Sequence, residues 1–244
     1  MRIGAAGKNA AGLSWSVSFD GGHVSSKSRH NVLDASGKQN IFGLSLSVGK
    51  RFEKISVALN GGVGHSRGKI TSSLPGSMQM DKLKTRVPET LFNVGGDVAY
   101  ALTEELSIAA APQLWVFPKA TEKTSIGSQD GFRLKNKAQV FAEVPLSLRG
   151  SWMVSSAADT KIHLKGELGG SVKVGKLSKE SRLFAVGTEA KEDISQKNFR
   201  RWNGFGTMAV SVEKGRFEGS LAASAATGDG KLDAGLMARA NWNF

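Results

Sequence analysis

The last nine residues, Leu236-Met237-Ala238-Arg239-Ala240-Asn241-Trp242-Asn243-Phe244, alternate apolar residues with polar or flexible ones and finish on an aromatic. Side chains on a strand point alternately to opposite faces, so this segment has two different faces. One face carries Leu236, Ala238, Ala240, Trp242 and Phe244, and the other carries Met237, Arg239, Asn241 and Asn243. Because one face suits lipid and the other suits water, the segment is predicted to be a strand between the two.

The same two-residue period recurs along the whole chain, which predicts an all-β protein. Ten strands are expected, at 13–19, 42–48, 55–63, 92–102, 106–110, 140–148, 162–174, 202–212, 217–225 and 232–244. Their charged opposite faces favour an apolar exterior. The fold class predicted is therefore an antiparallel, up-and-down transmembrane β-barrel.

The connections between these strands alternate in length. Short turns are expected at 50–53, 103–105, 151–159 and 213–216, and long polar loops at 21–39, 66–89, 118–137 and 176–201. Short turns on one side and long loops on the other are typical of such barrels, with the N-terminus on the periplasmic side. Pro112 and Pro145 fall inside expected strands, where proline removes a ladder hydrogen bond, so we expect bulges or strand ends there.

Composition indicates one domain of 244 residues, with residues 1–11 as a lead-in and residues 12–244 as the barrel. No apolar stretch reaches the roughly 18 residues of a membrane helix. The absence of cysteine excludes disulfides and thiolate metal sites, and no metal or cofactor is expected. Residues 1–8 lack the apolar core of a secretory signal, so we expect the chain to be part of a longer protein.

The net charge of +12 is unevenly distributed, because the four long loops together hold +11, whereas the short turns, counted as 50–54, 103–105, 151–159 and 213–216, sum to zero. A basic rim would lie beside the phosphates of lipopolysaccharide, where pairs with Lys and Arg are charge-assisted. A solubilising loop surface explains the same charges equally well. Nucleic acid is not an expected partner, because the basic residues lack interleaved aromatics and no helical or zinc module accompanies them.

Several of these strands resemble the translocator domain of autotransporters. The resemblance rests on Phe42-Gly43-Leu44-Ser45-Leu46-Ser47-Val48-Gly49, on Ile55-Ser56-Val57-Ala58-Leu59-Asn60-Gly61-Gly62-Val63-Gly64-His65-Ser66, on Gly95-Gly96-Asp97-Val98-Ala99-Tyr100, and on the closing segment from Gly235. It covers most of the chain, although glycine-rich alternating strands are common to many small barrels.

The resemblance implies a barrel of twelve strands in the bacterial outer membrane, which anchors an N-terminal passenger and helps to export it by type V secretion. The covalently linked passenger, the membrane lipid and the barrel assembly machinery are the implied partners, and a monomer is expected. The assembly signal is implied to be Leu236, Ala238, Ala240, Trp242 and Phe244. The chain departs from the family in showing ten strands and in having too few residues before 12 for the helix that crosses the family's lumen.

Charged residues on the polar strand faces are predicted to face the lumen: Asp97, Glu143, Arg149, Lys161, His163, Lys165, Glu167, Lys173, Glu218, Asp233 and Arg239. Their mixed signs suit pairing across the interior or a hydrated passage, which indicates transport and not catalysis. A stand-alone small barrel, acting as an adhesin or a pore, is the alternative.

One motif raises a hydrolase as a further alternative, because Gly64-His65-Ser66-Arg67-Gly68 fits the G-x-S-x-G pattern. That nucleophile elbow requires a strained turn from a strand into a helix, and no helix is predicted after this strand. A barrel hydrolase could instead use His65 and Ser66 with His23 or His30 near the outer rim. We expect no enzyme activity.

Overall fold

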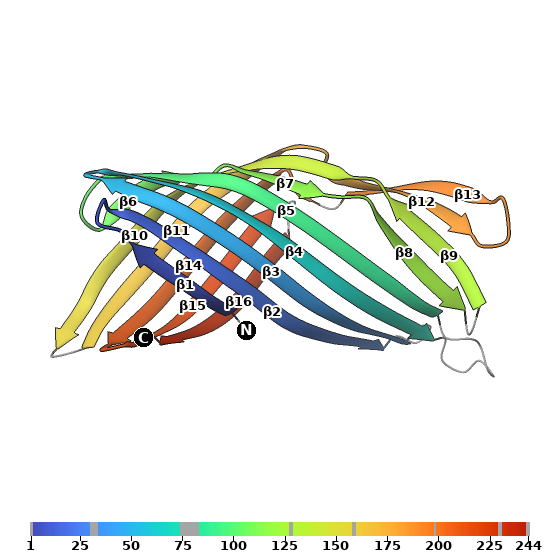
Figure 1. Cartoon of the computed structure of the whole chain (residues 1–244), viewed down its shortest axis with the longest axis horizontal. Helices are drawn as coiled ribbons and strands as arrows, with labels where there is room; N and C mark the ends of the chain where they lie inside the picture. The colour runs from blue at the N-terminus through green and yellow to red at the C-terminus, as the bar shows by residue number, and fades with distance from the viewer. Residues whose placement is uncertain are drawn as a thin grey trace.

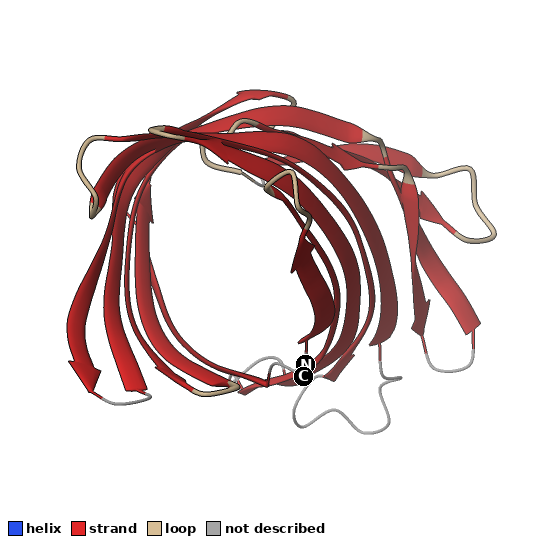
Figure 2. Ribbon diagram, turned by 60° about the vertical axis from the view of Figure 1, so that its left-hand side comes forward, coloured by secondary structure: helices blue, strands red, loops and turns tan. Residues whose placement is uncertain are grey.

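The computed structural model describes residues 2–29, 34–73, 83–126, 129–157, 160–197, 199–228 and 231–242. These residues form one antiparallel sheet of 16 strands, which curls into a barrel (Figures 1 and 2). No helix long and apolar enough to cross a membrane occurs in this part of the chain. The predicted fold class, an all-β antiparallel up-and-down transmembrane barrel, is confirmed.

The first half of the wall consists of four long strands after one short one. The short strand is β1 (Arg2–Lys8), and β2 (Leu13–Arg29), β3 (Asp34–Phe52), β4 (Ile55–Ser73) and β5 (Leu83–Ala101) follow. Each pairs with the next along nearly its full length. Residues 1–11, expected as a lead-in, therefore include a wall strand. Its small residues Gly4, Ala5, Ala6 and Gly7 give little period-2 signal, which explains why the sequence did not predict it.

The second half of the wall consists of strands that are interrupted at one level. Each of the next four strands of the wall is divided into segments by short breaks. The first consists of β6 (Leu106–Ala110), β7 (Gln113–Phe117) and β8 (Ala120–Ile126), and the second of β9 (Gln129–Asn136) and β10 (Gln139–Ala157). The third consists of β11 (Thr160–Gly175) and β12 (Ser178–Ala185), and the fourth of β13 (Lys191–Lys197) and β14 (Trp202–Lys214). The wall ends with β15 (Phe217–Gly228) and β16 (Lys231–Trp242). Beyond the breaks, β8, β9, β12 and β13 pair among themselves at the right-hand end of Figure 1.

Eleven strands therefore follow one another along the barrel path from β1 to β16, one more than the ten predicted. The prediction of long loops at 21–39, 66–89, 118–137 and 176–201 is wrong, because these segments are largely extensions of the strands. Apolar alternation fades where a strand leaves the lipid, while the backbone ladder continues. The expected turn at 151–159 is also shorter, since β10 runs to Ala157.

The two prolines lie next to each other in the sheet. Pro112 falls in the break between β6 and β7, as expected, and its carbonyl accepts a hydrogen bond of 2.9 Å from the Gly96 amide. Pro145 lies inside β10, where its carbonyl accepts from the Ala111 amide at 3.1 Å. The position of the missing Pro145 amide therefore faces the break between β6 and β7, where the ladder is already interrupted. The proline consequently removes no further ladder hydrogen bond, and β10 continues through it.

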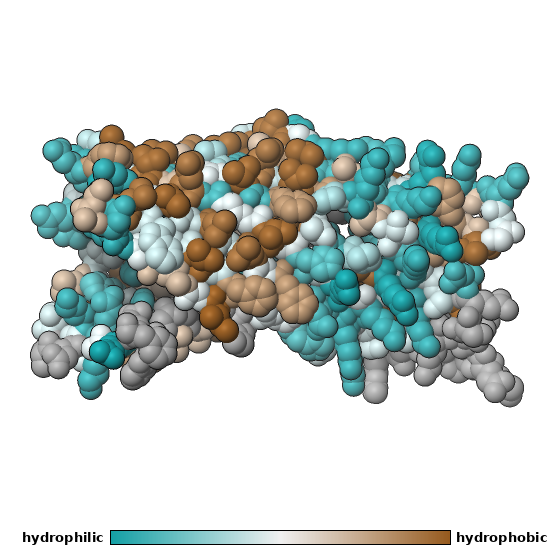
Figure 3. Space-filling model, viewed as in Figure 1, coloured by the Kyte–Doolittle hydropathy of each residue, from teal (hydrophilic) through white to brown (hydrophobic). Residues whose placement is uncertain are grey.

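The outward face carries an apolar belt. Along β3, Phe42, Leu44, Leu46 and Val48 are exposed, whereas Gly43, Ser45, Ser47 and Gly49 between them are half-buried. Ten residues separate Phe42 from Phe52, which is about 26 Å along the axis at about 3.4 Å per residue and a tilt of about 40°. Figure 3 shows the belt at the left and middle, and hydrophilic residues at the right, where the strands continue.

Aromatic residues border the belt at both ends. Toward the short turns lie Phe52, Tyr100, Trp152 and Phe217, and toward the strand extensions lie Phe19, Phe42, Phe92 and Trp202, all of them exposed. Two aromatic girdles that flank an apolar band of about 25 Å are the surface of a transmembrane barrel. The apolar face is therefore the lipid face.

Candidate functional site: the polar inner wall

The inner wall of the first four long strands consists of small side chains. Ser18 on β2 contacts Ser45 on β3 at 2.9 Å between their hydroxyl oxygens. Farther along, the Gln39 amide donates a 3.0 Å hydrogen bond to the Ser66 hydroxyl. A Cβ at Gly62 would lie 2.8 Å from the Asn93 side-chain oxygen and 3.0 Å from the Leu44 carbonyl oxygen, so the close approach of these strands favours glycine there. This half of the lumen is consequently polar and carries few charges.

Arg149 on β10 is the centre of the charged part of the inner wall. Its guanidinium pairs with Asp97 on β5 at 2.7 Å and with Glu167 on β11 at 2.9 Å. The Ser147 hydroxyl donates to the same Glu167 oxygen at 2.6 Å. Asp97 lies two strand lines away from β10, so the arginine side chain crosses the intervening β6. Three predicted lumen residues thus form one network.

A second ion pair lies nearer the strand extensions. Lys173 on β11 contacts Glu143 on β10 at 3.0 Å, and the Ser171 hydroxyl donates to the same carboxylate at 2.8 Å. Both charged side chains are mostly buried, with 12 % and 19 % exposed. A buried carboxylate is stable only when it is paired and hydrogen-bonded, and Glu143 has both kinds of partner.

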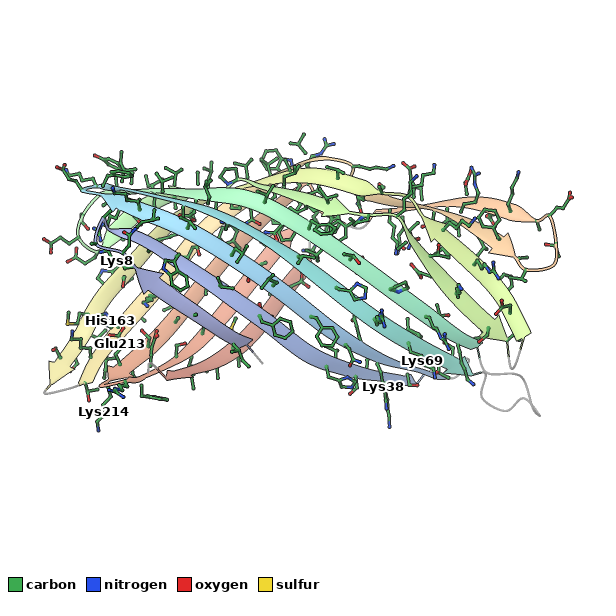
Figure 4. The ribbon with its side chains drawn as sticks, in the orientation of Figure 1. Lys8, Lys38, Lys69, His163, Glu213 and Lys214 are labelled. Atoms are coloured by element: carbon green, nitrogen blue, oxygen red, sulfur yellow. The ribbon has the colours of Figure 1, made fainter. Side chains whose placement is uncertain are left out.

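The other predicted lumen residues do not join these clusters. Lys161, His163 and Lys165 continue along β11 toward the short turns, where Figure 4 shows His163 near Glu213 and Lys214. Lys161 lies opposite Glu213 in the register between β11 and β14. Asp233 pairs with Arg200 at 3.4 Å, Glu218 lies opposite Asn241, and Arg239 lies opposite Ser220.

Two groups of inward residues were not predicted. Phe141, which is 3 % exposed, stacks on Trp115 and Phe117, with ring centroids 6.4 Å and 6.2 Å apart, and Phe199 completes this aromatic cluster. These residues lie beside the common strand breaks and fill the bend there. The second group is Glu122, which pairs with Lys179 at 2.8 Å and accepts a hydrogen bond from Asn136. Large aromatic residues at positions that alternation assigns to the polar face are an exception to the two-residue period. This exception is the sequence signal that could have predicted the cluster.

The G-x-S-x-G segment lies within β4, so no turn into a helix follows it. His65 and Ser66 point to opposite faces of the sheet, because they are consecutive in a strand. His65 contacts the Thr90 hydroxyl at 2.8 Å on the outer face, whereas Ser66 accepts from Gln39 on the inner face. His65 therefore cannot act as a general base for the Ser66 hydroxyl. His23 contacts Asn40 at 2.7 Å, and His30 lies outside the described residues.

On the closing strand, three residues of the implied assembly signal lie on the lipid face. Leu236, Ala238 and Ala240 lie opposite Ala223, Leu221 and Gly219, and Leu236 is 82 % exposed. Trp242 lies opposite Phe217, and Phe244 is outside the described residues. Within the described residues, no three His, Asp or Glu side chains form a group that could hold a metal ion.

Ion pairs also occur on the strands beyond the breaks. Hydrogen bonds from Lys137 and Lys176 lower the pKa of Glu180, with the Lys137 bond the larger cause. The Arg182 guanidinium holds Asp193 through two bonds of 2.7 and 3.0 Å, which lowers the pKa of that carboxyl and raises the pKa of Arg182. These pairs join β12 to β13 and to Lys137, the residue that follows β9, in an otherwise solvent-facing extension.

Comparison with known proteins bears on the fold. No family model and no curated protein matches this chain. Among solved structures, the translocator domain of the autotransporter NalP from Neisseria meningitidis aligns with a TM-score of 0.67 and 15 % identity, covering 100 % of this chain and 79 % of that one. The Ralstonia pickettii toluene transporter TbuX aligns with a TM-score of 0.58 and 9 % identity, covering 100 % and 81 %. At these identities the likeness shows the fold: this chain is a barrel of the kind seen in a translocator domain and a transporter.

Proposed function

We propose that this chain is the translocator barrel of an autotransporter, located in the bacterial outer membrane. The observation that carries the proposal is the contrast between its two faces, an apolar belt with aromatic girdles outside and a wall of small polar and paired charged residues inside. Only closed barrels and helices satisfy every backbone group in lipid, so this belt requires insertion as a barrel. The likeness to the NalP translocator domain supports the same assignment.

The proposed task is to anchor a covalently linked N-terminal passenger and to help its export. The wall strands β1 and β16 both run toward the short turns, and the described residues show no pairing between them. An antiparallel strand between these two edges would bring the total to twelve, the number that the family resemblance implies. Assembly by the outer-membrane barrel machinery, with Leu236, Ala238, Ala240, Trp242 and Phe244 as the signal, belongs to the same proposal.

The position of β1 sets the length of the connection to a passenger. Arg2 lies opposite Asp20, and β2 continues nine residues farther to Arg29. A twelfth strand before residue 1 would run beside β1 back to the short-turn end, so the segment that joins it to the passenger must cross the lumen from there to the outer end of β2. β2 spans 16 residue steps from Leu13 to Arg29, which is about 42 Å along the axis at a tilt of about 40° and takes about 28 helical residues. A reporter attached with a shorter link should not reach the cell surface.

Export of a reporter passenger tests the function. A signal peptide, an epitope-tagged reporter, a linker of about 30 residues and a segment of about ten residues that can form the twelfth strand are placed before residue 1, and protease is added to intact cells. We expect the epitope to be removed from the cell surface, whereas a matched fusion with a linker of about 8 residues stays protected.

The alternative is a stand-alone pore or adhesin, and the likeness to the toluene transporter TbuX is the observation that favours it. A barrel that reaches the outer membrane as a heat-modifiable species, but leaves both reporters in the periplasm, would contradict translocation and support this alternative. Steady conductance of the isolated barrel in planar bilayers would then identify a pore.

A further inference from the structure

The outward face of the strand extensions carries a row of cations. Lys38 on β3 lies opposite Lys69 on β4, Lys69 opposite Arg86 on β5, and Arg86 opposite Lys123 on β8. All four side chains are exposed. Neighbouring strands are about 4.8 Å apart, so the four positions fall within about 15 Å. Figure 4 shows Lys38 and Lys69 near each other toward the right-hand end of the sheet.

Such a row is unfavourable without an anion. Like charges that lie directly opposite each other on a sheet destabilise it. None of the four has a carboxylate partner among the residues that the structure describes, although other cations of the strand extensions, such as Lys179 and Arg182, do. Within the described part of the chain, ion pairs therefore leave the positive charge of this row uncompensated.

The cations line a groove and are not scattered over a convex surface. A groove of 560 Å³ is lined by Lys38, Lys69, Arg86 and Lys123, and also by Arg67 and His23. The Arg67 Nε donates to His65 at 3.3 Å, and His65 in turn contacts Thr90, so the guanidinium is held in place. A guanidinium held at one nitrogen and facing a groove can donate its remaining N–H groups to an oxyanion.

The position of the groove points to a membrane lipid as its ligand. The strand residues alternate, so Lys38 lies on the same outward face of β3 as Phe42, which belongs to the aromatic girdle. Four residues separate them, about 10 Å along the axis at a tilt of about 40°. Cations at this height lie beside lipid headgroups, while the belt below contacts acyl chains.

We propose that this groove binds the phosphate groups of lipopolysaccharide, whose acyl chains lie along the belt of β2 to β5. The inference rests on the proposed location in the outer membrane and adds a specific lipid site on one side of the barrel. Charge-assisted bonds from several Lys and Arg side chains to phosphate oxygens provide the recognition. Bound phosphate groups would compensate the like charges of the row.

Binding of purified lipopolysaccharide to the refolded barrel in zwitterionic detergent tests the site. The variant Lys38→Gln/Lys69→Gln/Arg86→Gln should bind at least about tenfold more weakly, since one lost charge-assisted contact commonly changes an affinity by about that factor. The control Lys50→Gln/Lys54→Gln/Lys214→Gln removes the same charge from the short-turn end and should change the affinity less than about threefold. Equal losses in the two variants would overturn the proposal.

Two further arms identify the ligand. Enzymatically dephosphorylated lipopolysaccharide should bind the native barrel as weakly as intact lipopolysaccharide binds the triple groove variant. Equal binding of the intact and the dephosphorylated lipid to the native barrel would overturn the role of phosphate. Inorganic pyrophosphate should compete only at far higher concentration than the lipid. Competition at equal phosphate concentration would assign the groove to a soluble anion and overturn the lipid proposal.

A stability measurement separates binding from a structural role. In phosphatidylcholine vesicles at low salt, the groove variant should unfold no earlier than the native barrel, because the substitutions relieve repulsion. Added lipopolysaccharide should stabilise the native barrel more than the variant, and a variant that is already less stable without the lipid would contradict the proposal. Failure of the native barrel to insert into vesicles of any composition would overturn the proposed function as well, whereas insertion without selective lipid binding overturns this inference alone.

Discussion

Replacing Leu168 by Arg tests which face of the wall contacts lipid. Leu168 on β11 is 70 % exposed, so its replacement leaves no cavity and the cost is that of placing a guanidinium in hydrocarbon. Trp152 lies opposite Leu164 and Trp202 opposite Val172, which puts Leu168 four residues from each girdle. That is about 10 Å along the axis from either interface, near the midplane.

At this depth, arginine on the lipid face costs about 2 to 4 kcal/mol of unfolding free energy. The matched change is Glu167→Gln, one residue away at the same depth on the inner face. Glutamine still accepts from Ser147 and Arg149, and Arg149 retains Asp97. Because the Arg149 and Glu167 side chains are each 33 % exposed, losing their charge attraction should cost less than about 1 kcal/mol.

The assay is urea unfolding in lipid vesicles, followed by the fluorescence of the five tryptophans. Leu168→Met keeps the volume and the apolar character, and it should stay within about 1.5 kcal/mol of the native protein. If Glu167→Gln cost more than Leu168→Arg, the apolar face would be the interior, and the assignment of the lipid face would be wrong.

Three further predictions follow from the structure. Deleting Phe244 should reduce the heat-modifiable fraction in cells much more than refolding into vesicles, since a terminal residue adds little to the ladder; equal losses would mean that it only packs. Because the pKa values of Glu180 and Asp193 are lowered, their ion pairs stabilise the fold above the ordinary values of 4.5 and 3.8, and this stability is lost as the pH falls through the lowered values. The protection factors of the amides in β12 and β13, which are corrected for the intrinsic exchange rate at each pH, should therefore fall in acid before those of β3 and β4, and a uniform fall would contradict this. Protease added to intact cells should cut between β4 and β5 or between β12 and β13 and spare the turns at 50–53 and 103–105, and cleavage confined to the short turns would reverse the orientation.

The sequence predicted the membrane-spanning part of the wall because lipid imposes a two-residue period on it. Residues such as Phe42, Leu44 and Leu46 must face lipid, so their spacing is visible in the chain. Where β3 continues to Lys38, both faces are polar and the period disappears, although pairing with β4 persists. The strand extensions were missed for this reason, whereas β1 was missed because its residues are mostly small.

The ion pairs of the inner wall depend on register, which periodicity does not specify. Arg149 and Asp97 are 52 residues apart in sequence and meet only because β5, β6 and β10 are aligned as they are. The cation row has the same origin, since Lys38, Lys69 and Arg86 come from separate segments that the sequence indicated only as basic. Position on a face could be predicted, whereas partners across strands could not.

Cysteine scanning of β11 tests the central claim most directly, because the chain has no native cysteine. Single cysteines are placed from Ile162 to Val174 in the barrel inserted into vesicles, and each is tested with a water-soluble maleimide and by quenching of an attached fluorophore with brominated lipid. The account predicts that even positions, including Leu164, Leu168 and Val172, are quenched by lipid, while odd positions such as Lys165 and Lys173 react with the maleimide. Reversed alternation, or no alternation between residues 164 and 172, would contradict it.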